Sequence, residues 1–444
     1  MKLTPSRRVN GSLRVPGDKS IAHRAALVSI LAGGPITVRN FPDNDDCRRS
    51  LEAARACGVT VEQDNDILKL TPPETLPKED ITIDAGNSGT TTRLLAGLAA
   101  GSSLSMVITG DESLSKRPMK RIVEPLSSMG AEVIDTEGHL PLTIHGKKLL
   151  PFEYRLPIPS AQVKSSLLLA GQASGCSVVI KEDIPSRNHT EVMLKHLGAN
   201  IEIIDIKPEL VDDPRDPRRK RRVRREDYRT EIRLSPGGQQ LSGEVDIPGD
   251  ISTAAFFFAA AAITGGSVTV RQVGLNPTRT GILQHLKNVG CGVEITNRAE
   301  ISGEKRGDVT VTGAALKGRK ISGETTVALI DELPVVAVLA AFAEGTTVIR
   351  DAGELRVKES DRLQAIADNL QRMGVKVGLL PDGLAIEGGG HPQGADFVSY
   401  GDHRIAMAFS VAALAADGPS TIDDPSIVSV SCPEFYTLLT ELIS

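Results

Sequence analysis

The sequence is poor in aromatic residues. It has no tryptophan, and aromatic residues make up only 3% of its 444 positions. Proteins that bind single-stranded nucleic acid commonly stack bases on aromatic side chains, so this composition disfavours that class. Lysine and arginine (51) are balanced by aspartate and glutamate (56), which gives a net charge of -5 at pH 7. No overall positive field would attract nucleic acid or an anionic membrane, and neither is expected as a partner.

Cysteine and long apolar runs are also scarce. The five cysteines form no C-x-x-C pair, which argues against a disulfide framework or a zinc site and is typical of a reducing compartment. No stretch approaches the roughly 20 apolar residues of a membrane span. The first residues, MKLTPSRRVNGSLRV, lack the apolar segment of a signal peptide. We therefore expect a cytoplasmic protein without a membrane span or a metal.

What the sequence does contain is an internal repeat. The segment VPGDKSIAHRAALVSILAGGPITVRNF, from Val15, is similar to IPGDISTAAFFFAAAAITGGSVTVRQV, from Ile247. Six copies recur at intervals of roughly 70 to 90 residues. The other four begin at Gly86, Pro159, Asp331 and Gly401.

Each copy predicts the order β-α-β-α-β-β. Its first helix is almost uniformly apolar and must be interior, whereas its second helix is amphipathic, ends at a glycine and must cover the outside. The likeness of copies one and four indicates a duplication of three units. We therefore predict an α/β fold with two lobes joined by two crossings: an N-terminal lobe of residues 16–246, and a C-terminal lobe of residues 1–15 plus 247–444. Such a chain is expected to be a monomer whose lobes close on substrate.

The third copy is lengthened by a charged segment from Lys207 to Leu234. Its prolines and dense charge predict a solvated loop or an extended hairpin rather than core. The basic run 218–222 could serve in nuclear localisation or RNA binding, but the overall composition disfavours that interpretation.

Polar residues gather where the helices of each copy begin. An apolar helix can carry polar groups cheaply only at its N-terminus, where unpaired N–H groups favour anions. At the first helices these residues are Lys19, Ser20, Arg24, Asn87, Gly89, Thr90, Arg93, Ser160, Gln162, His403 and Arg404. At the second helices they are Arg117, Arg187, Lys358, Glu359 and Arg362.

Cations at a helix N-terminus oppose its dipole, so their presence needs another explanation. If both lobes direct these ends toward one cleft, the arginines and lysines suit phosphate and carboxylate groups, and Ser20, Ser160 and Gln162 suit a polyol. The sequence thus predicts one or two small anionic substrates. Asp331 and Glu359 stand within this set and are candidates for proton transfer. P-loop, G-x-G-x-x-G and H-E-x-x-H motifs are absent, so we expect neither an ATP loop nor a metal.

Structural roles compete with these interpretations. Asp18, Asp250 and Asp331 are favourable helix N-caps, and we expect Asp250 to be one. A structural role is favoured for His23 and His189 and is left open for His403. The cysteines are expected in the core rather than as reactive thiols.

Seven ordered motifs carry a resemblance over essentially the whole chain: PGDKSIAHRA, GNSGTTTRL, SLSKRPM, PSAQVKSSLLLAG, IDELPV, RVKESDR and GDHRIAM. Together they resemble the EPSP synthase family of enolpyruvyl transferases, in its class II branch. The resemblance implies a two-lobed inverse α/β barrel of six βαβαββ units, three per lobe, and no cofactor. It also implies transfer of the enolpyruvyl group of phosphoenolpyruvate to the 5-hydroxyl of shikimate-3-phosphate, in the pathway to chorismate and the aromatic amino acids.

On matching positions the resemblance also implies site residues. Shikimate-3-phosphate would be held by Lys19, Ser20, Arg24, Ser160, Gln162, Arg187, Asp331 and Lys358. Phosphoenolpyruvate would be held by Lys19, Gly89, Arg117, Gln162, Arg362 and Arg404. Asp331 would accept the proton of the 5-hydroxyl. Lys19 and Glu359 are the candidates to protonate the methylene carbon.

The chain departs from the family pattern near its end, where VSVSCPEF replaces a stretch in which some members carry a lysine before Phe-Pro. Gly89 stands where inhibitor-tolerant relatives carry alanine, so this motif does not decide glyphosate sensitivity. The nearest rival, a sister enzyme that uses UDP-N-acetylglucosamine, has Lys-Asn in place of Lys19-Ser20 and a loop cysteine that SLSKRPMKR lacks. A non-catalytic scaffold that binds RNA or protein through the basic insertion is the alternative of another class.

Overall fold

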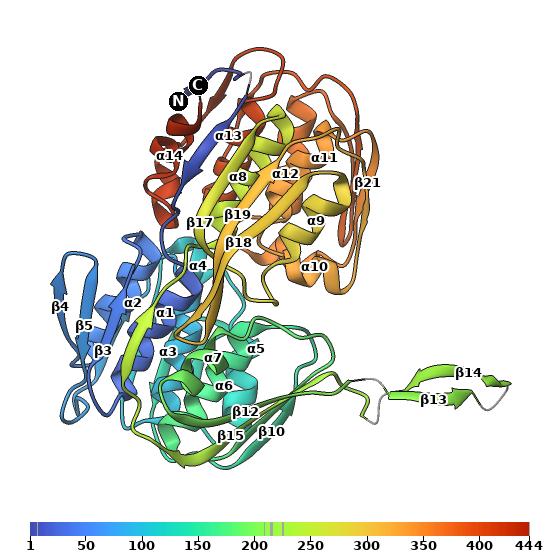
Figure 1. The fold of residues 1–444 in the computed structure, drawn as a ribbon. Helices are drawn as coiled ribbons and strands as arrows, with labels where there is room; N and C mark the ends of the chain where they lie inside the picture. Colours follow the sequence, from blue (N-terminus) through green and yellow to red (C-terminus); the bar gives the residue numbers. More distant parts are fainter. Residues whose placement is uncertain (7, 208, 214–215, 224–225, 444) are drawn as a thin grey trace.

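The computed structural model describes residues 1–6, 8–207, 209–213, 216–223 and 226–443, without the side chains of residues 208–225. Its buried apolar side chains fall into two clusters. One cluster draws on residues 21–247, and the other combines residues 3–15 with residues 251–442. Figure 1 shows the two parts one above the other, with both chain ends on the upper part.

The lower part of Figure 1 contains three units, each with a four-stranded sheet. The first unit has β16 (Gly243–Asp246), β3 (Ile36–Arg39), β5 (Ile67–Thr71) and β4 (Thr60–Asp64), with α1 (Lys19–Val28), the 3-10 helix η1 (Ser29–Leu31) and α2 (Asp45–Ala56). The second has β6 (Ile81–Asp84), β7 (Ser105–Thr109), β9 (His139–His145) and β8 (Glu132–Thr136), with α3 (Gly89–Gly101), α4 (Glu112–Ser115) and α5 (Lys120–Ser128). The third has β10 (Phe152–Arg155), β11 (Val178–Glu182), β15 (Thr230–Gly238) and β12 (Ala199–Asp205), with α6 (Ala161–Ser174), α7 (His189–His196) and an added hairpin of β13 (Glu209–Asp213) and β14 (Asp216–Val223).

The upper part contains the other three units. The fourth unit has β2 (Asn10–Leu13), β17 (Ser267–Gly274), β19 (Glu304–Thr312) and β18 (Gly292–Ile301), with α8 (Ile251–Thr264) and α9 (Gly281–Val289). The fifth has β20 (Lys320–Ile321), β21 (Gly345–Ile349), β23 (Gly383–Gly388) and β22 (Lys376–Leu380), with α10 (Glu324–Leu329), α11 (Leu333–Phe342), η2 (Gly353–Val357) and α12 (Arg362–Arg372). The sixth has β24 (Asp396–Phe397), β25 (Ser420–Ile422) and β1 (Lys2–Leu3), with α13 (His403–Ala413), η3 (Ser426–Val430) and α14 (Phe435–Leu442).

The predicted unit is confirmed in five copies and shortened in the sixth. In each unit the first two strands are parallel and the other pairs are antiparallel. The described part of the sixth unit has only two strands of its own. Its third strand, β1, comes from the start of the chain and pairs Lys2 with Thr421.

The chain crosses between the two parts at each Pro-Gly-Asp segment: the strand before the segment lies in one part, and the helix after it lies in the other. β2 is parallel to β17 in the sheet of the fourth unit, and β16 is parallel to β3 in the sheet of the first. The two segments cross side by side, because the N–H of Asp18 donates to Pro248 O (2.8 Å) and the N–H of Asp250 donates to Pro16 O (2.9 Å). The α1 and α8 helices therefore begin next to each other at the junction.

Six apolar helices form the two interiors, as their composition predicts. In one part α3 packs against α1 and α6, and in the other α8, α11 and α13 pack against one another. The approach of α3 to α6 requires glycine: a Cβ on Gly97 would lie 2.0 Å from Ser166 O, and a Cβ on Gly101 would lie 2.1 Å from Ala170 O.

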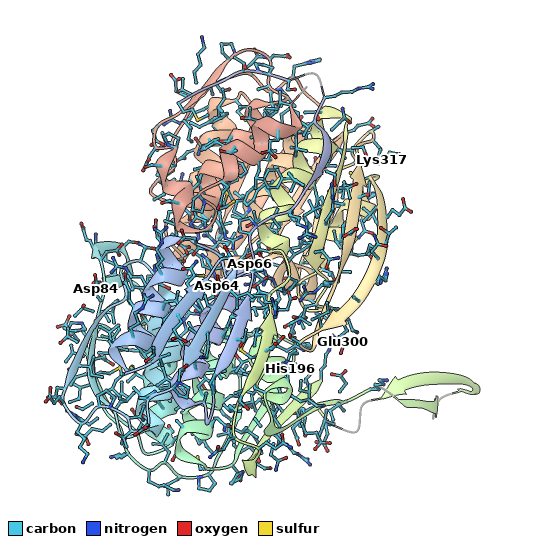
Figure 2. All side chains as sticks on the ribbon, turned by 60° about the vertical axis from the view of Figure 1, so that its left-hand side comes forward. Asp64, Asp66, Asp84, His196, Glu300 and Lys317 are labelled. Atoms are coloured by element: carbon cyan, nitrogen blue, oxygen red, sulfur yellow. The ribbon has the colours of Figure 1, made fainter. Side chains whose placement is uncertain are left out.

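The outside of the molecule is polar. Figure 2 shows the exposed Asp84, His196 and Lys317 on its surface. All five cysteines are buried and unpaired, as the sequence predicts. Among the helices that the structure describes, none has the length and apolar character needed to cross a membrane.

The charged insertion is part hairpin and part core. β13 and β14 pair antiparallel and project away from the rest of the molecule (Figure 1), as the predicted hairpin requires. The prediction of a solvated segment as far as Leu234 was wrong, because residues 230–234 lie in β15 between β11 and β12. Ile232 and Leu234 alternate with charged neighbours and are buried in the core. The side chains of the basic run 218–222 lie outside the described residues.

Candidate active site

The N-terminal ends of the interior helices meet in a cleft between the two parts, which encloses about 1230 Å³ and is partly open to solvent. Cationic side chains outnumber carboxylates in its lining, although the chain as a whole is negative. The cations are Lys19, Arg24, Arg93, Arg117, Arg121, Arg187, Arg279, Lys358 and Arg404. The carboxylates are Asp46, Asp250, Asp331, Glu354 and Glu359. Such a cleft suits small substrates with several negative charges.

The structure places all but one of the predicted site residues in the lining of this cleft. These are Lys19, Ser20, Arg24, Gly89, Arg117, Ser160, Gln162, Arg187, Asp331, Lys358, Glu359 and Arg404. Arg362 lies just behind the surface, where its side chain is 1% exposed. Its Nε donates to Asp402 (2.7 Å) and one terminal nitrogen donates to Glu359 (2.7 Å).

Arg24, on α1, is held by neutral groups. Its Nε donates to the Thr190 hydroxyl (2.6 Å), and its terminal nitrogens donate to the Ser165 hydroxyl (2.9 Å) and the Ser20 carbonyl (2.7 Å). Burial lowers the pKa of Arg24 to about 10, so it stays protonated at neutral pH. The ion pairs of the described residues include none with Arg24, so its charge is available to a bound anion.

Gln162, at the start of α6, links that helix to α3. Its Oε1 accepts from Arg93 (2.7 Å), and its Nε2 donates to the Thr90 hydroxyl (3.1 Å). These two bonds fix which way the amide faces. Burial, with help from Arg121 and Arg117, lowers the pKa of Arg93 to about 9, which still leaves it charged at neutral pH.

Lys19 begins α1 at the crossing of the two parts. Its Nζ lies 2.7 Å from Asp46 Oδ2, and its backbone N–H donates to Asp250 Oδ2 (3.1 Å). Burial alone would lower the pKa of Lys19, but the Asp46 carboxylate outweighs burial and raises it. Lys19 therefore carries a proton at neutral pH. Asp250 caps α8 through Ser252 N–H (2.8 Å), as the sequence predicts.

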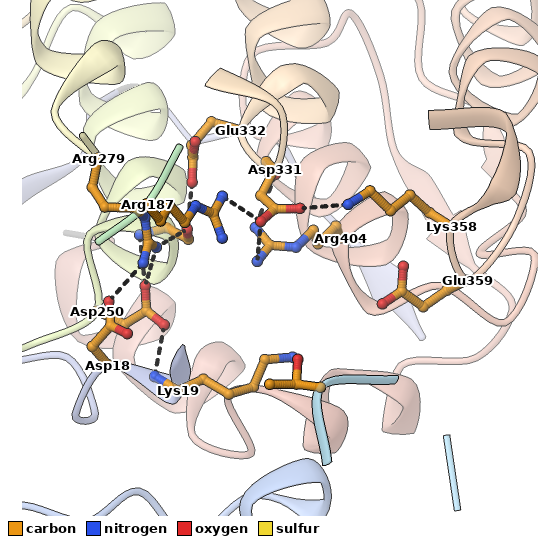
Figure 3. A network of polar contacts seen from close by, with 12 residues as sticks. Asp18, Lys19, Arg187, Asp250, Arg279, Asp331, Glu332, Lys358, Glu359 and Arg404 are labelled. Atoms are coloured by element: carbon orange, nitrogen blue, oxygen red, sulfur yellow. Dashed lines mark hydrogen bonds and ion pairs between the residues drawn. The ribbon is translucent and has the colours of Figure 1, made fainter. Parts of the chain in front are cut away.

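Asp331 precedes α11 and does not cap it. Its carboxylate forms an ion pair with Arg187, which comes from the other part of the chain. Three more cations surround it: Lys358 at 3.8 Å, Arg362 at 3.6 Å and Arg404 at 4.0 Å. Figure 3 shows Lys358 and Arg404 beside Asp331. Burial would raise the pKa of Asp331, but the four cations hold it well below its usual range. It is therefore an ionised carboxylate, able to accept a proton.

Glu359 lies on the same side of the cleft. Its carboxylate is 2.7 Å from Arg362 and 3.8 Å from Arg117, which comes from the opposite part. Burial would raise its pKa, but Arg362, Arg117 and other cations hold the pKa well below its usual range. Nearby, burial and Lys19 hold the pKa of His403 well below its usual range, so this imidazole is neutral.

His23 and His189 have structural roles, as predicted. His23 Nδ1 lies 2.8 Å from the Ser50 hydroxyl. His189 Nε2 lies 3.2 Å from a terminal nitrogen of Arg279, which can only donate, so Nδ1 carries the hydrogen and donates to Glu304 (2.6 Å). His189 thus links the two parts.

Sequence reasoning missed four charged residues of the lining. Arg279 donates to Asp18 (3.0 Å) and Ser252 (2.7 Å) and lies near Asp250, so it binds both caps at the crossing. It precedes the second helix of the fourth copy, as Arg117 precedes that of the second, and comparison of the repeats could have found it. Arg121 ends the stretch SLSKRPMKR but was not singled out there, and no motif marks Asp46 or Glu354.

The described residues include no group of three or more histidine, cysteine, aspartate or glutamate side chains able to hold a metal ion. The cleft instead offers paired cations and carboxylates, supplied by both parts of the chain. It can bind anions through the cations and exchange protons through Lys19, Asp331 and Glu359.

Known proteins resemble this chain over nearly its full length. The family model of EPSP synthase (3-phosphoshikimate 1-carboxyvinyltransferase) matches residues 3–215 and 220–439. The 3-phosphoshikimate 1-carboxyvinyltransferase of Geobacter sulfurreducens is 44% identical over 444 residues, which cover 99% of this chain and 98% of that protein. That of Desulforamulus reducens is 43% identical over 448 residues, with 99% of each covered. The solved structure of EPSP synthase from Acinetobacter baumannii superposes with a TM-score of 0.81 at 36% identity, and covers 99% of this chain and 97% of that one.

Proposed function

The chain belongs to the EPSP synthase family, and from this membership we propose which residues of the cleft carry out the family's reaction. The protein transfers the enolpyruvyl group of phosphoenolpyruvate to the 5-hydroxyl of shikimate-3-phosphate. The products are 5-enolpyruvylshikimate-3-phosphate and phosphate. The product leads to chorismate and the aromatic amino acids. One observation carries the proposal: Asp331, Glu359 and Lys19 lie among cations of both parts in one cleft.

Shikimate-3-phosphate binds to the groups that hold a phosphate and a polyol: Lys19, Ser20, Arg24, Ser160, Gln162, Arg187, Asp331 and Lys358. The neutral hydrogen-bond partners of Arg24 support a phosphate contact, because a dianion would supply the direct ion pair that the described residues do not give it. Arg187 is the second phosphate contact. Its present partner is Asp331, and the substrate phosphate would compete for it.

Phosphoenolpyruvate binds to Lys19, Gly89, Arg117, Gln162, Arg362 and Arg404. Gly89 is the first residue of α3 and lines the cleft, and its N–H donates to Asn87 O (3.0 Å). Two guanidinium groups flank it: terminal nitrogens of Arg93 and Arg117 would lie 2.8 Å and 3.4 Å from a Cβ at Gly89. Arg362 also donates to Glu359, and its remaining terminal nitrogen has no hydrogen-bond partner among the described residues, so this nitrogen is the one it would offer to the substrate.

The charge states of the cleft support a division of the proton transfers. As the 5-hydroxyl oxygen bonds to C2 of phosphoenolpyruvate, its proton passes to the ionised Asp331. At the same time the methylene carbon C3 takes a proton, and Lys19 is the group that carries one. Glu359 is ionised, which suits it to the second step. There the C2–O bond to phosphate breaks, C3 gives up a proton, and the enol ether forms.

We propose that the two apolar clusters are the cores of two lobes, of residues 16–246 and of residues 1–15 plus 247–444. Strands β2 and β16 support this division, because each pairs within the lobe that it is assigned to. We also propose that the protein works as a cytoplasmic monomer. Five unpaired cysteines support the compartment, and two lobes that form the cleft between them support the monomer.

Phosphate release tests this function. Purified protein is given phosphoenolpyruvate with either shikimate-3-phosphate or UDP-N-acetylglucosamine, without added metal, and the same assay is run on Asp331→Asn. We expect the wild-type protein to release phosphate when the acceptor is shikimate-3-phosphate and not when it is UDP-N-acetylglucosamine. We expect the variant to release none with either acceptor. Release with the nucleotide sugar, or with neither acceptor, would refute the proposal.

A further inference from the structure

A buried ion cluster lies in the N-terminal lobe. Lys164, on α6, places its Nζ 2.9 Å from Glu182 Oε2 and 2.8 Å from Glu191 Oε1. All three side chains are 0–1% exposed. None of the three lines the cleft. Burying such charges costs several kcal/mol for each ion, and a cluster of apolar residues would often be at least as stable, so stability alone does not explain it.

The cluster closes a loop. Glu182 is the last residue of β11, and Glu191 lies in the first turn of α7, so the two carboxylates stand at the two ends of the segment 183–188. Both are held by the single ammonium of Lys164, which also donates to Ser186 O (3.4 Å). Glu182 Oε1 in turn accepts from the N–H of Ser186 (3.1 Å) and from its hydroxyl (2.5 Å).

The next residue in this loop is Arg187. It points the other way, into the cleft, where it meets Asp331 (Figure 3). Ser186, which the cluster holds by its N–H, carbonyl and hydroxyl, therefore fixes the backbone from which Arg187 extends. The two carboxylates outweigh burial and raise the pKa of Lys164, whereas burial, with a contribution from Glu191, raises the pKa of Glu182.

We propose that Lys164, Glu182 and Glu191 form a clamp that positions Arg187 for the phosphate of shikimate-3-phosphate, and that they are positioning residues that do not touch substrate. This inference rests on the proposed role of Arg187 in binding that substrate. It predicts that a residue outside the cleft sets the affinity for one substrate and not for the other, since Arg187 is not among the phosphoenolpyruvate contacts.

Glu182→Gln tests the clamp. The amide keeps the size of the side chain but loses its negative charge. Its single oxygen can accept from Lys164 or from Ser186, but not from both as the two carboxylate oxygens do. We expect the Kd of shikimate-3-phosphate, measured by calorimetry without phosphoenolpyruvate, to rise about tenfold, with a matching rise in its KM and an unchanged KM for phosphoenolpyruvate. Glu182→Asp, which keeps the charge but draws the carboxylate back from Ser186, is expected to give a smaller rise in the same direction.

A double-mutant cycle shows whether Glu182 acts through Arg187. In an Arg187→Gln background, Glu182→Gln should weaken binding less than twofold further, because the group that it positions is gone. Glu231→Gln is the matched control: this buried carboxylate lies on the neighbouring strand β15 and contacts Tyr228 and Arg233, away from the cleft. It should leave both KM values unchanged.

Three results would overturn the inference. The first is an equal loss of affinity in the wild-type and Arg187→Gln backgrounds, since Glu182 would then act on the fold in general. The second is unchanged affinity in both Glu182 variants. The third is absence of shikimate-3-phosphate binding to the wild-type protein, which would remove the proposed function itself. If Glu182→Gln does not fold, the cycle is run with Glu182→Asp.

Discussion

Arg187 and Asp331 form an ion pair across the cleft, although 144 positions and the junction of the two lobes separate them in the chain. The pair brings the proposed phosphate contact and the proposed base into direct contact when no substrate is bound. A phosphate that draws Arg187 away removes one of the four cations around Asp331, and the pKa of Asp331 then rises. We expect Asp331 to become a stronger base when shikimate-3-phosphate binds, which links base strength to the presence of the acceptor.

Asp331→Asn should abolish turnover while keeping the fold. The amide cannot take up the proton of the 5-hydroxyl, and loss of a positioned base costs about 10²- to 10⁴-fold in kcat. Binding of shikimate-3-phosphate should persist, because the variant leaves Arg187, Lys358 and Arg404 with less negative charge to balance. Phosphate release gives kcat, and calorimetry gives the affinity. A variant that retains more than a tenth of the wild-type kcat would show that another group is the base.

The sequence predicts the units of this fold well because its signals are local. An interior helix such as α8 (Ile251–Thr264) is apolar on every side, and α12 (Arg362–Arg372) is apolar on one, so burial follows from composition. The paired Pro-Gly-Asp motifs predict the two crossings that follow β2 and β16. The error at β15 has the same origin: alternating Ile232 and Leu234 are a strand signal, but dense charge around them obscured it.

The sequence could predict those site residues that are cations near a helix N-terminus, where the helix dipole disfavours them. It could not predict those that are acids at such a position, because acids are common there. Arg24 and Arg404 stand near helix N-termini, where a cation is unfavourable, so they attract attention in the sequence. Asp46, the partner of Lys19, lies in the first turn of α2, where an acid is ordinary. Its role depends on a contact 27 positions away, which no local pattern contains.

Gly89→Ala should weaken phosphoenolpyruvate binding in particular. A Cβ on this residue would lie 2.8 Å from a terminal nitrogen of Arg93 and 3.4 Å from one of Arg117. The Arg93 guanidinium would have to move, whereas the contact with Arg117 would be an ordinary one, and we expect the KM for phosphoenolpyruvate to rise about tenfold, or ~1.4 kcal/mol. The KM for shikimate-3-phosphate should change less than twofold. Steady-state kinetics with each substrate varied in turn measures both.

Gly390→Ala is the control for this change. It has an ordinary negative φ, and its new Cβ would meet no atom within 4 Å. Both KM values should match those of the wild type. If Gly89→Ala raises the two KM values equally, the substitution disturbs the cleft as a whole and the assignment of Gly89 to phosphoenolpyruvate is wrong.

Replacing residues 209–223 by a short glycine-serine turn should leave catalysis intact. This segment contains β13 and β14, which project away from the rest of the molecule (Figure 1), and its described residues are not among those that line the cleft. The turn keeps the root of the hairpin, where Ile206 N–H donates to Arg229 O (2.7 Å). We expect kcat/KM for both substrates within about twofold of the wild type. A loss of activity in a folded variant would instead support the scaffold alternative, in which the insertion carries the function.

A larger deletion gives the contrasting result. Removal of residues 207–234 also takes out the part of β15 that pairs with β11 and β12, including the buried Ile232 and Leu234. Two side chains of this kind cost about 2–5 kcal/mol each when truncated to alanine. The protein should therefore be largely insoluble or unfolded by circular dichroism, for a reason unrelated to any role of the basic run.

Asp18 should make the protein sensitive to acid. Burial would raise the pKa of this carboxyl, but Arg279 and other cations outweigh burial and lower it from 3.8 to about 2. The unfolded chain therefore binds this proton at a higher pH than the folded one does. The resulting stability, about 2 kcal/mol, is present in full above pH 4 to 5 and is lost as the pH falls toward 2. Asp18→Asn removes the titration but keeps the N-cap acceptor that binds Ile21 N–H (3.1 Å). Urea unfolding at pH 5, 4 and 3 should show a steeper loss of unfolding free energy in the wild type than in the variant. Equal slopes would mean that the carboxyl of Asp18 titrates alike in both states, and that Arg279 does not hold it ionised.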